Sequence, residues 1–358
     1  MAAAPPLVVA PVEFAACSLA WSPYDERRLA VATGANFGIV GNGAQVVLDV
    51  RAGAPPPAPP AALAPVCRLL TNDSLNDCAW SETREHHLLA ACGDGSLKLW
   101  DLELARTHGG RPLAAARAHD AEVSGVDWSS LRKDLVASCG WDRAVKVWAA
   151  EALHEPIATL FAPPHGAPEV HDVRWAPHAA GTLASASGDG AARVWALQSG
   201  KAELVLGAHG ADVLSVDWHK YAGHTLATGC VDQLIRVWDL RRPATPVGVL
   251  RGHRLAVRRV RFSPHDSRLL LSCSYDMSAA VWDAAAPYAL ATYAHHSEFV
   301  TGAEWALFTP GLIATCSWDG TVSLLGAPGA PHGGGGGAAL EADGALLALP
   351  RAEASAPT

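Results

Sequence analysis

Apolar residues in this chain occur in short alternating runs separated by glycine, aspartate and proline, and helical periodicity is nowhere sustained. Around Trp128, this alternation predicts a first strand over 122–128 and a second over 135–139. A third strand is predicted over 145–148, after a Gly-Trp-Asp-Arg turn, and a fourth, looser one near 157–160. Short runs rich in Val, Leu and Trp between turn residues are typical of antiparallel strands.

This block of strands recurs along the chain with a fixed internal distance. Seven units carry a large aromatic marker at the end of the first predicted strand: Trp21, Trp80, Trp128, Trp175, Trp218, Phe262 and Trp305. The last six units carry a second large apolar residue twenty positions later: Trp100, Trp148, Trp195, Trp238, Trp282 and Leu325. Because the last six markers are spaced 43 to 48 residues apart, the chain is a repeat array. We therefore predict an all-β, seven-bladed β-propeller over residues 1–325.

Some segments depart from the repeat. In the first unit the two marker positions are 27 residues apart, which predicts about seven extra residues near 36–40. The stretch 52–65 is proline-rich and is expected to form an extended loop, and the Gly/Ala-rich tail 326–358 is expected to be flexible. The fourth strand of the last blade has to come from a chain terminus. Residues 7–14 are the favoured source and 339–349 the alternative.

A polar constellation recurs at fixed distances from the markers. A histidine lies nine residues before the first marker in four units and, with one insertion, in a fifth: His119, His209, His253, His296 and His165. A hydroxyl lies ten residues before the second marker: Ser138, Ser185, Thr228, Ser272 and Thr315. An aspartate lies six residues before it: Asp94, Asp142, Asp189, Asp232, Asp276 and Asp319.

These groups can form one hydrogen-bonded chain from aspartate through imidazole and hydroxyl to the indole N–H of Trp148, Trp195, Trp238 or Trp282. The pattern resembles a Ser-His-Asp triad, but it occurs several times over. An enzyme needs one triad, whereas a propeller needs one such clamp in each blade. We therefore interpret the constellation as structural.

Composition and charge exclude several classes of function. Charged residues make up 17% of the chain and the net charge is −8, which disfavours nucleic acid as a partner. Five of the eight cysteines occupy equivalent places in successive units and there is no C-x-x-C pair, so a reducing compartment is expected. The N-terminus lacks a basic secretory region, and no apolar run reaches the roughly 20 residues of a membrane span. A soluble, cytosolic protein is expected.

Catalytic and metal-binding motifs are absent from the sequence. There is no Walker loop, G-x-S-x-G, H-E-x-x-H or D-x-D-x-D-G segment, so an enzyme is not expected. The pairs His86-His87 and His295-His296 could offer metal ligands, but adjacent side chains in a strand or turn point apart. No metal or cofactor is therefore expected.

Several units resemble the WD-repeat family, through CGDGSLKLWD (92–101), SCGWDRAVKVW (138–148) and TGCVDQLIRVWDL (228–240). Other segments resemble a narrower family, the receptors for the type-2 peroxisomal targeting signal. They are SPYDERRLAVATGANFGIVGNG (22–43), EVSGVDWS (122–129), LASASGDG (183–190), VDWHKY (216–221), AVRRVRFSPH (256–265), SCSYD (272–276) and HHSEF (295–299). The resemblance covers about 14–325 and includes the unusual first unit.

This resemblance implies a receptor that binds an N-terminal helical peptide of cargo enzymes. The implied peptide has an Arg near its start, apolar residues one or two turns on, and a later His or Gln. The implied partners are cargo proteins with this signal, an import co-receptor and peroxisomal docking proteins. The implied location is the cytoplasm, with cycling to the peroxisome.

A basic amphipathic helix requires acidic groups and an apolar pad on a propeller face. Glu122, Glu169 and Asp212 lie six residues before the first markers of three consecutive units. Trp141, Tyr275 and Trp318 lie just before clamp aspartates, and Arg258 interrupts the acidic arc. These seven residues form the candidate peptide-binding site. The alternative is that the acids are solvated loop charges and the aromatics pack on neighbouring turns.

Two other functions remain open from the sequence. Trp238-Asp239-Leu240-Arg241 forms a W-D-x-R box, which suggests a substrate receptor of a cullin-type ubiquitin ligase, although this dipeptide also ends ordinary third strands. A histone-binding propeller would share the WD motifs. The absence of a long N-terminal helix pattern disfavours that function.

Overall fold

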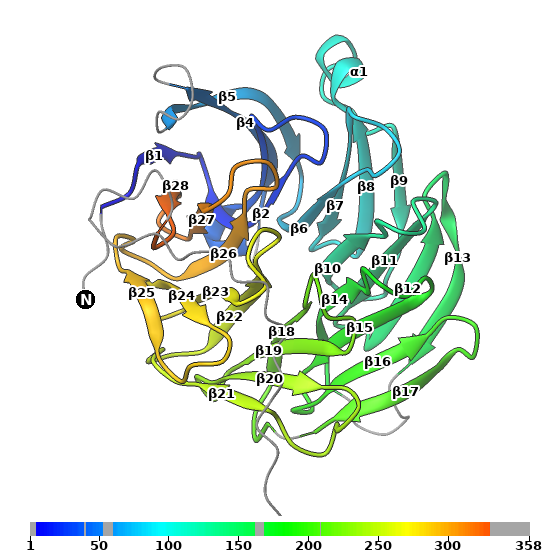
Figure 1. The fold of residues 1–358 in the computed structure, drawn as a ribbon. Helices are drawn as coiled ribbons and strands as arrows, with labels where there is room; N and C mark the ends of the chain where they lie inside the picture. Colours follow the sequence, from blue (N-terminus) through cyan, green and yellow to red (C-terminus); the bar gives the residue numbers. More distant parts are fainter. Residues whose placement is uncertain (1–4, 39–40, 53–59, 162–167, 208, 330–358) are drawn as a thin grey trace, which may run out of the picture.

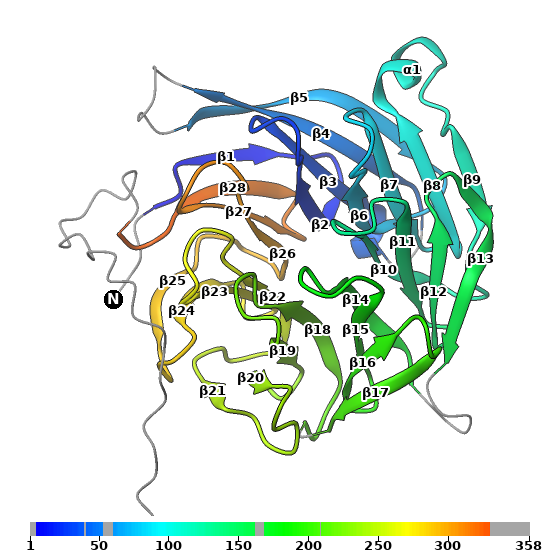
Figure 2. The same cartoon turned by 45° about the vertical axis from the view of Figure 1, so that its right-hand side comes forward.

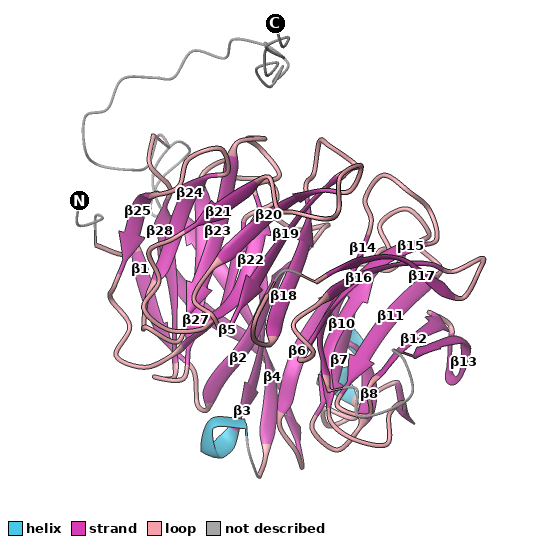
Figure 3. Cartoon of the chain, turned by 90° about the horizontal axis from the view of Figure 1, so that it is seen from below, coloured by secondary structure: helices cyan, strands magenta, loops and turns pink. Residues whose placement is uncertain are grey.

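The protein is a ring of seven antiparallel four-stranded sheets, or blades, in a computed structural model that describes residues 5–38, 41–52, 60–161, 168–207 and 209–329. The first strand of each blade lies next to the central axis and the later strands lie progressively further out (Figure 1). Helix in the described residues is confined to η1 (Ala35–Gly38) and α1 (Leu102–Thr107) (Figure 3). The predicted all-β, seven-bladed propeller is confirmed.

The blades follow one another in chain order. Blade 1 contains β2 (Ala15–Trp21), β3 (Arg28–Gly34), β4 (Gly43–Ala52) and β5 (Pro60–Thr71). Blade 2 contains β6 (Leu75–Trp80), β7 (His87–Cys92), β8 (Ser96–Asp101) and β9 (Ala114–Arg117). Blade 3 contains β10 (Val123–Trp128), β11 (Leu135–Gly140), β12 (Ala144–Ala149) and β13 (Ala152–Phe161). Blade 4 contains β14 (Val170–Trp175), β15 (Thr182–Ser187), β16 (Ala192–Ala196) and β17 (Lys201–Leu206).

The remaining blades keep the same plan. Blade 5 contains β18 (Val213–Trp218), β19 (Thr225–Cys230), β20 (Ile235–Asp239) and β21 (Gly248–Leu250). Blade 6 contains β22 (Val257–Phe262), β23 (Leu269–Ser274), β24 (Ala279–Asp283) and β25 (Ala289–Tyr293). Blade 7 contains β26 (Val300–Trp305), β27 (Leu312–Ser317), β28 (Thr321–Gly326) and, as its outer strand, β1 (Val8–Pro11). Within the described residues, no helix has the length and apolar character needed to cross a bilayer.

The N-terminus closes the ring, as the favoured prediction states. Strand β1 pairs antiparallel with β28, with Val8 opposite Leu324 and Pro11 opposite Thr321 (Figure 2). The first and last segments of the propeller therefore share one sheet, in which β1 is the outer partner of β28. The alternative segment, 339–349, and most of the predicted flexible tail lie outside the described residues.

Blade 1 differs from the sequence prediction in its outer strand. The stretch 52–65 was expected to be a loop, but residues 60–65 belong to β5 and pair with β4, with Leu48 opposite Pro65. Proline is tolerated there because β5 is the outermost strand and its second edge needs no donor. The extra residues predicted near 36–40 lie between β3 and β4, where Ala35–Gly38 forms η1.

The first-marker tryptophans tie neighbouring blades together. The indole N–H of Trp218 donates to the carbonyl of Arg174 in the preceding blade at 3.0 Å. Three others do the same, to Ala20, Asp127 and Arg261: Trp80 at 2.9 Å, Trp175 at 3.2 Å and Trp305 at 3.0 Å. Each of these four markers thus satisfies its buried indole with the inner strand of the blade before it.

The predicted clamp is present within the blades. In blade 3, Trp148 Nε1 donates to Ser138 Oγ at 2.9 Å, and His119 bridges Ser138 Oγ and Asp142 Oδ1 at 2.8 Å each. Burial opposes ionisation of Asp142, but the hydrogen bond and charge of His119 outweigh burial and hold the pKa of Asp142 at about 2.

The same arrangement recurs in three further blades. The histidine-to-hydroxyl distances are 2.8 Å for His209 and Thr228, 2.7 Å for His253 and Ser272, and 3.0 Å for His296 and Thr315. The histidine-to-carboxylate distances are 3.3 Å for Asp232, 2.9 Å for Asp276 and 2.9 Å for Asp319. The indole N–H of Trp238 donates to Thr228 Oγ1 at 2.9 Å and that of Trp282 donates to Ser272 Oγ at 2.8 Å. In blade 7, Leu325 replaces the indole. The clamp prediction is confirmed in these blades.

Blade 4 contains part of the clamp. Trp195 donates to Ser185 Oγ at 2.8 Å, and Asp189 accepts a hydrogen bond from Arg193 Nη1 at 3.1 Å. The predicted fifth histidine, His165, lies outside the described residues. In blade 2, which has Ala90 instead of a hydroxyl, the indole of Trp100 donates to the carbonyl of Gly110 at 3.1 Å.

Buried ion pairs cross the central axis. Arg259 of blade 6, only 1% exposed, contacts Asp77 of blade 2 at 3.0 Å and Asp172 of blade 4 at 3.2 Å. Arg174 of blade 4 lies 3.2 Å from Asp127 of blade 3, and Arg261 of blade 6 lies 2.9 Å from Glu304 of blade 7. The contacts of Arg259 therefore connect blades that are not neighbours, and those of Arg174 and Arg261 connect adjacent blades.

Replacing Ser272 with alanine tests the clamp. The change leaves His253 Nε2 and Trp282 Nε1 buried without their partner, so Ser272→Ala should lower the free energy of unfolding by about 1–3 kcal/mol. Urea denaturation followed by tryptophan fluorescence measures the change. Ser267→Ala, at an exposed serine in the same blade, is the control and should unfold at the wild-type midpoint. Equal midpoints for both variants would contradict the proposed role of the clamp.

Replacing Arg259 with methionine tests the axial ion pairs. The variant keeps most of the side-chain volume but leaves Asp77 and Asp172 buried without this cation, so it should lose about 3–5 kcal/mol of stability. Arg251→Met, at an exposed position, removes the same charge and should stay within about 0.5 kcal/mol of wild type. Thermal unfolding of both variants makes the comparison, and a small loss in Arg259→Met would refute the axial contribution.

Candidate functional site

A cavity of about 390 Å³ opens at the end of the channel where the inner strands begin. Eleven described residues line it: Cys17, Asn76, Glu122, Ser124, Trp141, His171, Leu214, Arg258, Tyr275, Thr301 and Trp318. Every blade contributes at least one of these side chains. The cavity therefore depends on closure of the whole ring.

Seven of the lining residues occupy one equivalent place, four residues before the first marker of each blade. They are Cys17, Asn76, Ser124, His171, Leu214, Arg258 and Thr301, and we call them the inner ring. Each coincides with a break in strand register, as in β22, where Val257 pairs with Ser274, Arg259 pairs with Cys273, and Arg258 is passed over. A β-bulge redirects the side chain of its extra residue. The repeated bulge thus turns one residue per blade toward the cavity.

Five of the seven predicted peptide-binding residues meet at this cavity: Glu122, Trp141, Tyr275, Trp318 and Arg258. Glu169 and Asp212 do not line it; Glu169 is exposed and Asp212 is half-exposed. The placement of Arg258 in the acidic arc is wrong, because the equivalent of Glu122 in blade 6 is Ala256. Arg258 belongs to the inner ring, below that arc.

The acidic and aromatic positions are coupled by the backbone. The N–H of Trp141 donates to the carbonyl of Glu122 at 2.9 Å, so the acid and the indole stand side by side in blade 3. In blades 4 and 5 the same bond joins Gly188 to Glu169 at 3.0 Å and Val231 to Asp212 at 2.9 Å. The residues that donate to Glu169 and Asp212 are therefore not aromatic, whereas the residue that donates to Glu122 is a tryptophan.

Tyr275 and Trp318 line the opposite side of the cavity, and the ring of Phe299 packs against both of theirs. The ring of Phe299 lies 4.8 Å from that of Tyr275 and 5.2 Å from that of Trp318, with interplanar angles of 28° and 39°. Phe299 occupies the position of Glu122 in blade 7 and was not predicted, although its place in the repeat identifies it. We call these three residues the aromatic wall. Trp141, 47% exposed, faces the cavity from blade 3.

Electrostatics differ between the two sides of the cavity. Burial and then the charge of Asp73 raise the pKa of Glu122, which is half-buried in blade 3. Burial and then the charge of Arg258 lower the pKa of His171, so its imidazole is neutral near pH 7. Burial opposes the charge on Arg258, but Tyr275, Asp172 and Asp77 outweigh burial and raise the pKa of its guanidinium.

The lining groups are suited to binding and lack a nucleophile. Burial raises the pKa of the Cys17 thiol to about 12, so it stays protonated. Ser124 Oγ donates to the carbonyl of Val170, and no described histidine is hydrogen-bonded to it. A cavity with a carboxylate, a guanidinium and several aromatic rings can bind an amphipathic segment.

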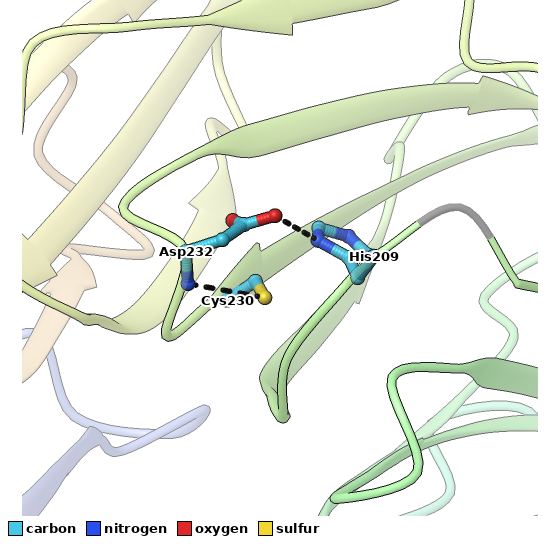
Figure 4. A group of neighbouring side chains, drawn as sticks. All are labelled: His209, Cys230 and Asp232. Carbon is cyan, nitrogen blue, oxygen red and sulfur yellow. Dashed lines mark hydrogen bonds and ion pairs between the residues drawn. The ribbon is translucent and has the colours of Figure 1, made fainter.

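One group of side chains among the described residues has the composition of a metal site: His209, Cys230 and Asp232 (Figure 4). His209 Nδ1 and the Asp232 carboxylate form the blade 5 clamp, and the guanidinium of Arg236 contacts both. Burial raises the pKa of Cys230 to about 12. A resident cation and a protonated thiol disfavour a metal ion there.

The histidine pair at 295–296 differs from the expectation for adjacent side chains. The two rings lie 4.2 Å apart and do not point apart. Burial, followed by the nearby His296, lowers the pKa of His295 to about 4. His296 is already bonded to Thr315 and Asp319, so this member of the pair belongs to the clamp of blade 7.

Comparison with known proteins gives consistent matches along the chain. The family model "WD domain, G-beta repeat" matches residues 65–101, 110–149, 200–239, 244–283 and 288–324. The "Peroxisomal targeting signal 2 receptor" of Dictyostelium discoideum is 41% identical over 82% of this chain and 89% of its own length. The mouse protein of the same name is 42% identical over 85% of this chain and 91% of its own length. "Peroxisome biogenesis protein 7" of Arabidopsis thaliana is 39% identical, over 84% of this chain and 92% of its own length.

Proposed function

Because the chain belongs to the family of the peroxisomal targeting signal 2 receptors, which are WD-repeat propellers, we propose that it binds the type-2 targeting peptide of cargo proteins. The peptide binds as an amphipathic helix across the mouth of the central cavity. The receptor then carries cargo from the cytoplasm to the peroxisome, together with an import co-receptor and docking proteins.

One observation carries this proposal: a half-buried carboxylate and an aromatic wall face each other across a single cavity. Glu122 lies in blade 3, and Tyr275, Phe299 and Trp318 lie in blades 6 and 7. A basic side chain of the helix pairs with Glu122 while its apolar stripe covers the aromatic rings. Large, rigid aromatic side chains and one desolvated charge are the usual centres of binding energy in such interfaces.

The two outer acids have a different role in this proposal. Glu169 and Asp212 lie outside the cavity in blades 4 and 5, where water and salt screen their charges. They attract the basic peptide during approach and contribute little to the bound state. Their replacement should therefore change the association rate more than the dissociation rate.

Binding without catalysis is the function that the lining chemistry favours. The histidine and hydroxyl of each complete clamp are buried within the blades, and the thiol in the cavity is protonated. Within the W-D-x-R box, Arg241 Nη2 donates to Asp239 Oδ2 at 2.6 Å. No observation in the described structure favours a ubiquitin-ligase or histone-binding role over the receptor role.

Replacing Glu122 with glutamine tests the acidic contact. The variant keeps the side-chain shape but loses the charge, so affinity for a synthetic type-2 targeting peptide should fall about tenfold or more. Affinity of the wild-type protein should also fall as pH drops through the raised pKa of Glu122, because the protonated acid cannot pair with a cation. Fluorescence anisotropy with a labelled peptide measures both effects.

The control for this experiment is Glu155→Gln, which makes the same charge change at an exposed position of the outer strand β13. It should bind like wild type. A charge-reversed peptide should bind neither protein. Unchanged affinity in a folded Glu122→Gln variant would remove this acid from the site.

Replacing Trp318 with alanine tests the aromatic wall. Loss of the indole removes contact area for the apolar stripe and should weaken peptide binding by about 1–3 kcal/mol. Isothermal titration calorimetry measures the affinity, and thermal unfolding reports on the fold. Tyr221→Ala, at a 55% exposed ring in the loop after β18, at the other end of the channel, should bind normally. Near-native binding by Trp318→Ala would place the apolar pad elsewhere.

A further inference from the structure

The side chain of Arg258 is unlike the other inner-strand arginines. Arg259, Arg261 and Arg174 each form ion pairs with carboxylates of other blades. The guanidinium of Arg258 has no hydrogen-bond acceptor among the described residues, and its Nη1 atom is buried. A guanidinium offers five N–H donors, and buried donors in proteins are normally paired. An acceptor for this group is therefore missing from the described residues.

The surroundings of Arg258 place the missing acceptor in the cavity. Arg258 is the bulged residue of β22, lines the cavity beside Tyr275, and belongs to the same inner ring as His171. His171 Nε2 is likewise buried without a hydrogen-bond partner among the described residues, and the nearest carboxylate oxygen, of Asp212, is 3.8 Å away. Two polar side chains that lack hydrogen-bond partners among the described residues therefore line the same cavity.

We propose that Arg258 is the positioning residue of this cavity and donates to a neutral hydrogen-bond acceptor of the bound peptide, a side-chain carboxamide or a backbone carbonyl. This inference rests on the proposed function and adds the chemistry and direction of the ligand. A neutral acceptor fits better than a carboxylate because the buried acids Asp77 and Asp172 lie beneath Arg258 and already offset its charge. A ligand carboxylate would face those two acids and Glu122.

The positions of the two polar groups also give the ligand a direction. Glu122 precedes β10 in blade 3, and Arg258 lies in β22 of blade 6, across the ring (Figure 1). A peptide lying over the cavity thus directs a hydrogen-bond donor toward Glu122 in blade 3 and a hydrogen-bond acceptor toward Arg258 in blade 6. Reversing the peptide would set its cation against Arg258.

Arg258→Met tests the proposal with the type-2 targeting peptide and a set of its single-alanine variants. The affinity for the unmodified peptide should fall about ten- to a hundredfold, because charge-assisted hydrogen bonds are lost. The thermal midpoint should not fall, because Arg258 forms no hydrogen bond within the described protein. Arg258→Lys keeps the charge without the planar fork and should show a smaller loss.

The matched control is Arg254→Met, an exposed arginine on the loop before β22 at the same mouth. It removes the same charge, so long-range attraction for a basic peptide should be unchanged or slightly stronger. A loss in Arg258→Met without a loss in Arg254→Met isolates the direct contact. Equal affinities of Arg258→Met and wild type would overturn the proposal.

The alanine variants identify the source of the acceptor. If one alanine substitution in the peptide weakens binding to wild type but not to Arg258→Met, the side chain replaced by that substitution is the acceptor. If Arg258→Met binds every peptide variant more weakly than wild type does, and by the same factor, the acceptor is a backbone carbonyl. Tighter binding of wild type when glutamate replaces that residue would overturn the neutral-acceptor assignment. If wild type does not bind the unmodified peptide, the proposed function fails, and the result is distinguishable from failure of this inference alone.

Discussion

The structure depends on pairing charge along the central axis. Seven inner strands converge there, and a buried carboxylate such as Asp77 or Asp172 needs a cation, which another blade supplies. Arg259 meets this need by joining Asp77 and Asp172, which come from blades 2 and 4. Arg174 and Arg261 extend the network to blades 3 and 7. These ion pairs therefore fix the positions of the blades relative to one another, and those positions set the shape of the cavity at the channel mouth.

The tryptophan repeat serves this architecture in two ways. First-marker indoles such as Trp218 bond to the preceding blade, whereas second-marker indoles such as Trp148 bond to the hydroxyl of their own blade. One set therefore fixes the blades to each other and the other fixes the turn to the strands within a blade. The two tryptophans outside the repeat, Trp141 and Trp318, line the cavity. Tryptophan therefore serves the scaffold at the marker positions and the candidate site at positions outside the repeat.

Much of the fold was predictable because it repeats. The blade count follows from the marker spacing, and the clamp residues follow from fixed distances that recur in several units. N-terminal closure follows from the need of the last blade for a fourth strand. The outer strand of blade 1 was missed because its prolines indicate a loop, whereas an edge position tolerates them (residues 60–65). The inner ring was also missed, since alternation predicts a regular strand and does not reveal that residues such as His171 and Arg258 are bulged.

The sequence by itself determined the number of blades, the hydrogen-bonded clamp and the family, because each depends on local spacing repeated many times. Only the tertiary structure decided which residues share the cavity. Glu122 and Arg258 are far apart in the chain and meet through closure of the ring, while Glu169 and Asp212, equivalent to Glu122 in sequence, lie outside the cavity. Arg258 reaches the cavity because a bulge turns it inward, and Glu122 stands beside Trp141 because a backbone hydrogen bond joins the two residues; strand alternation alone predicts neither contact.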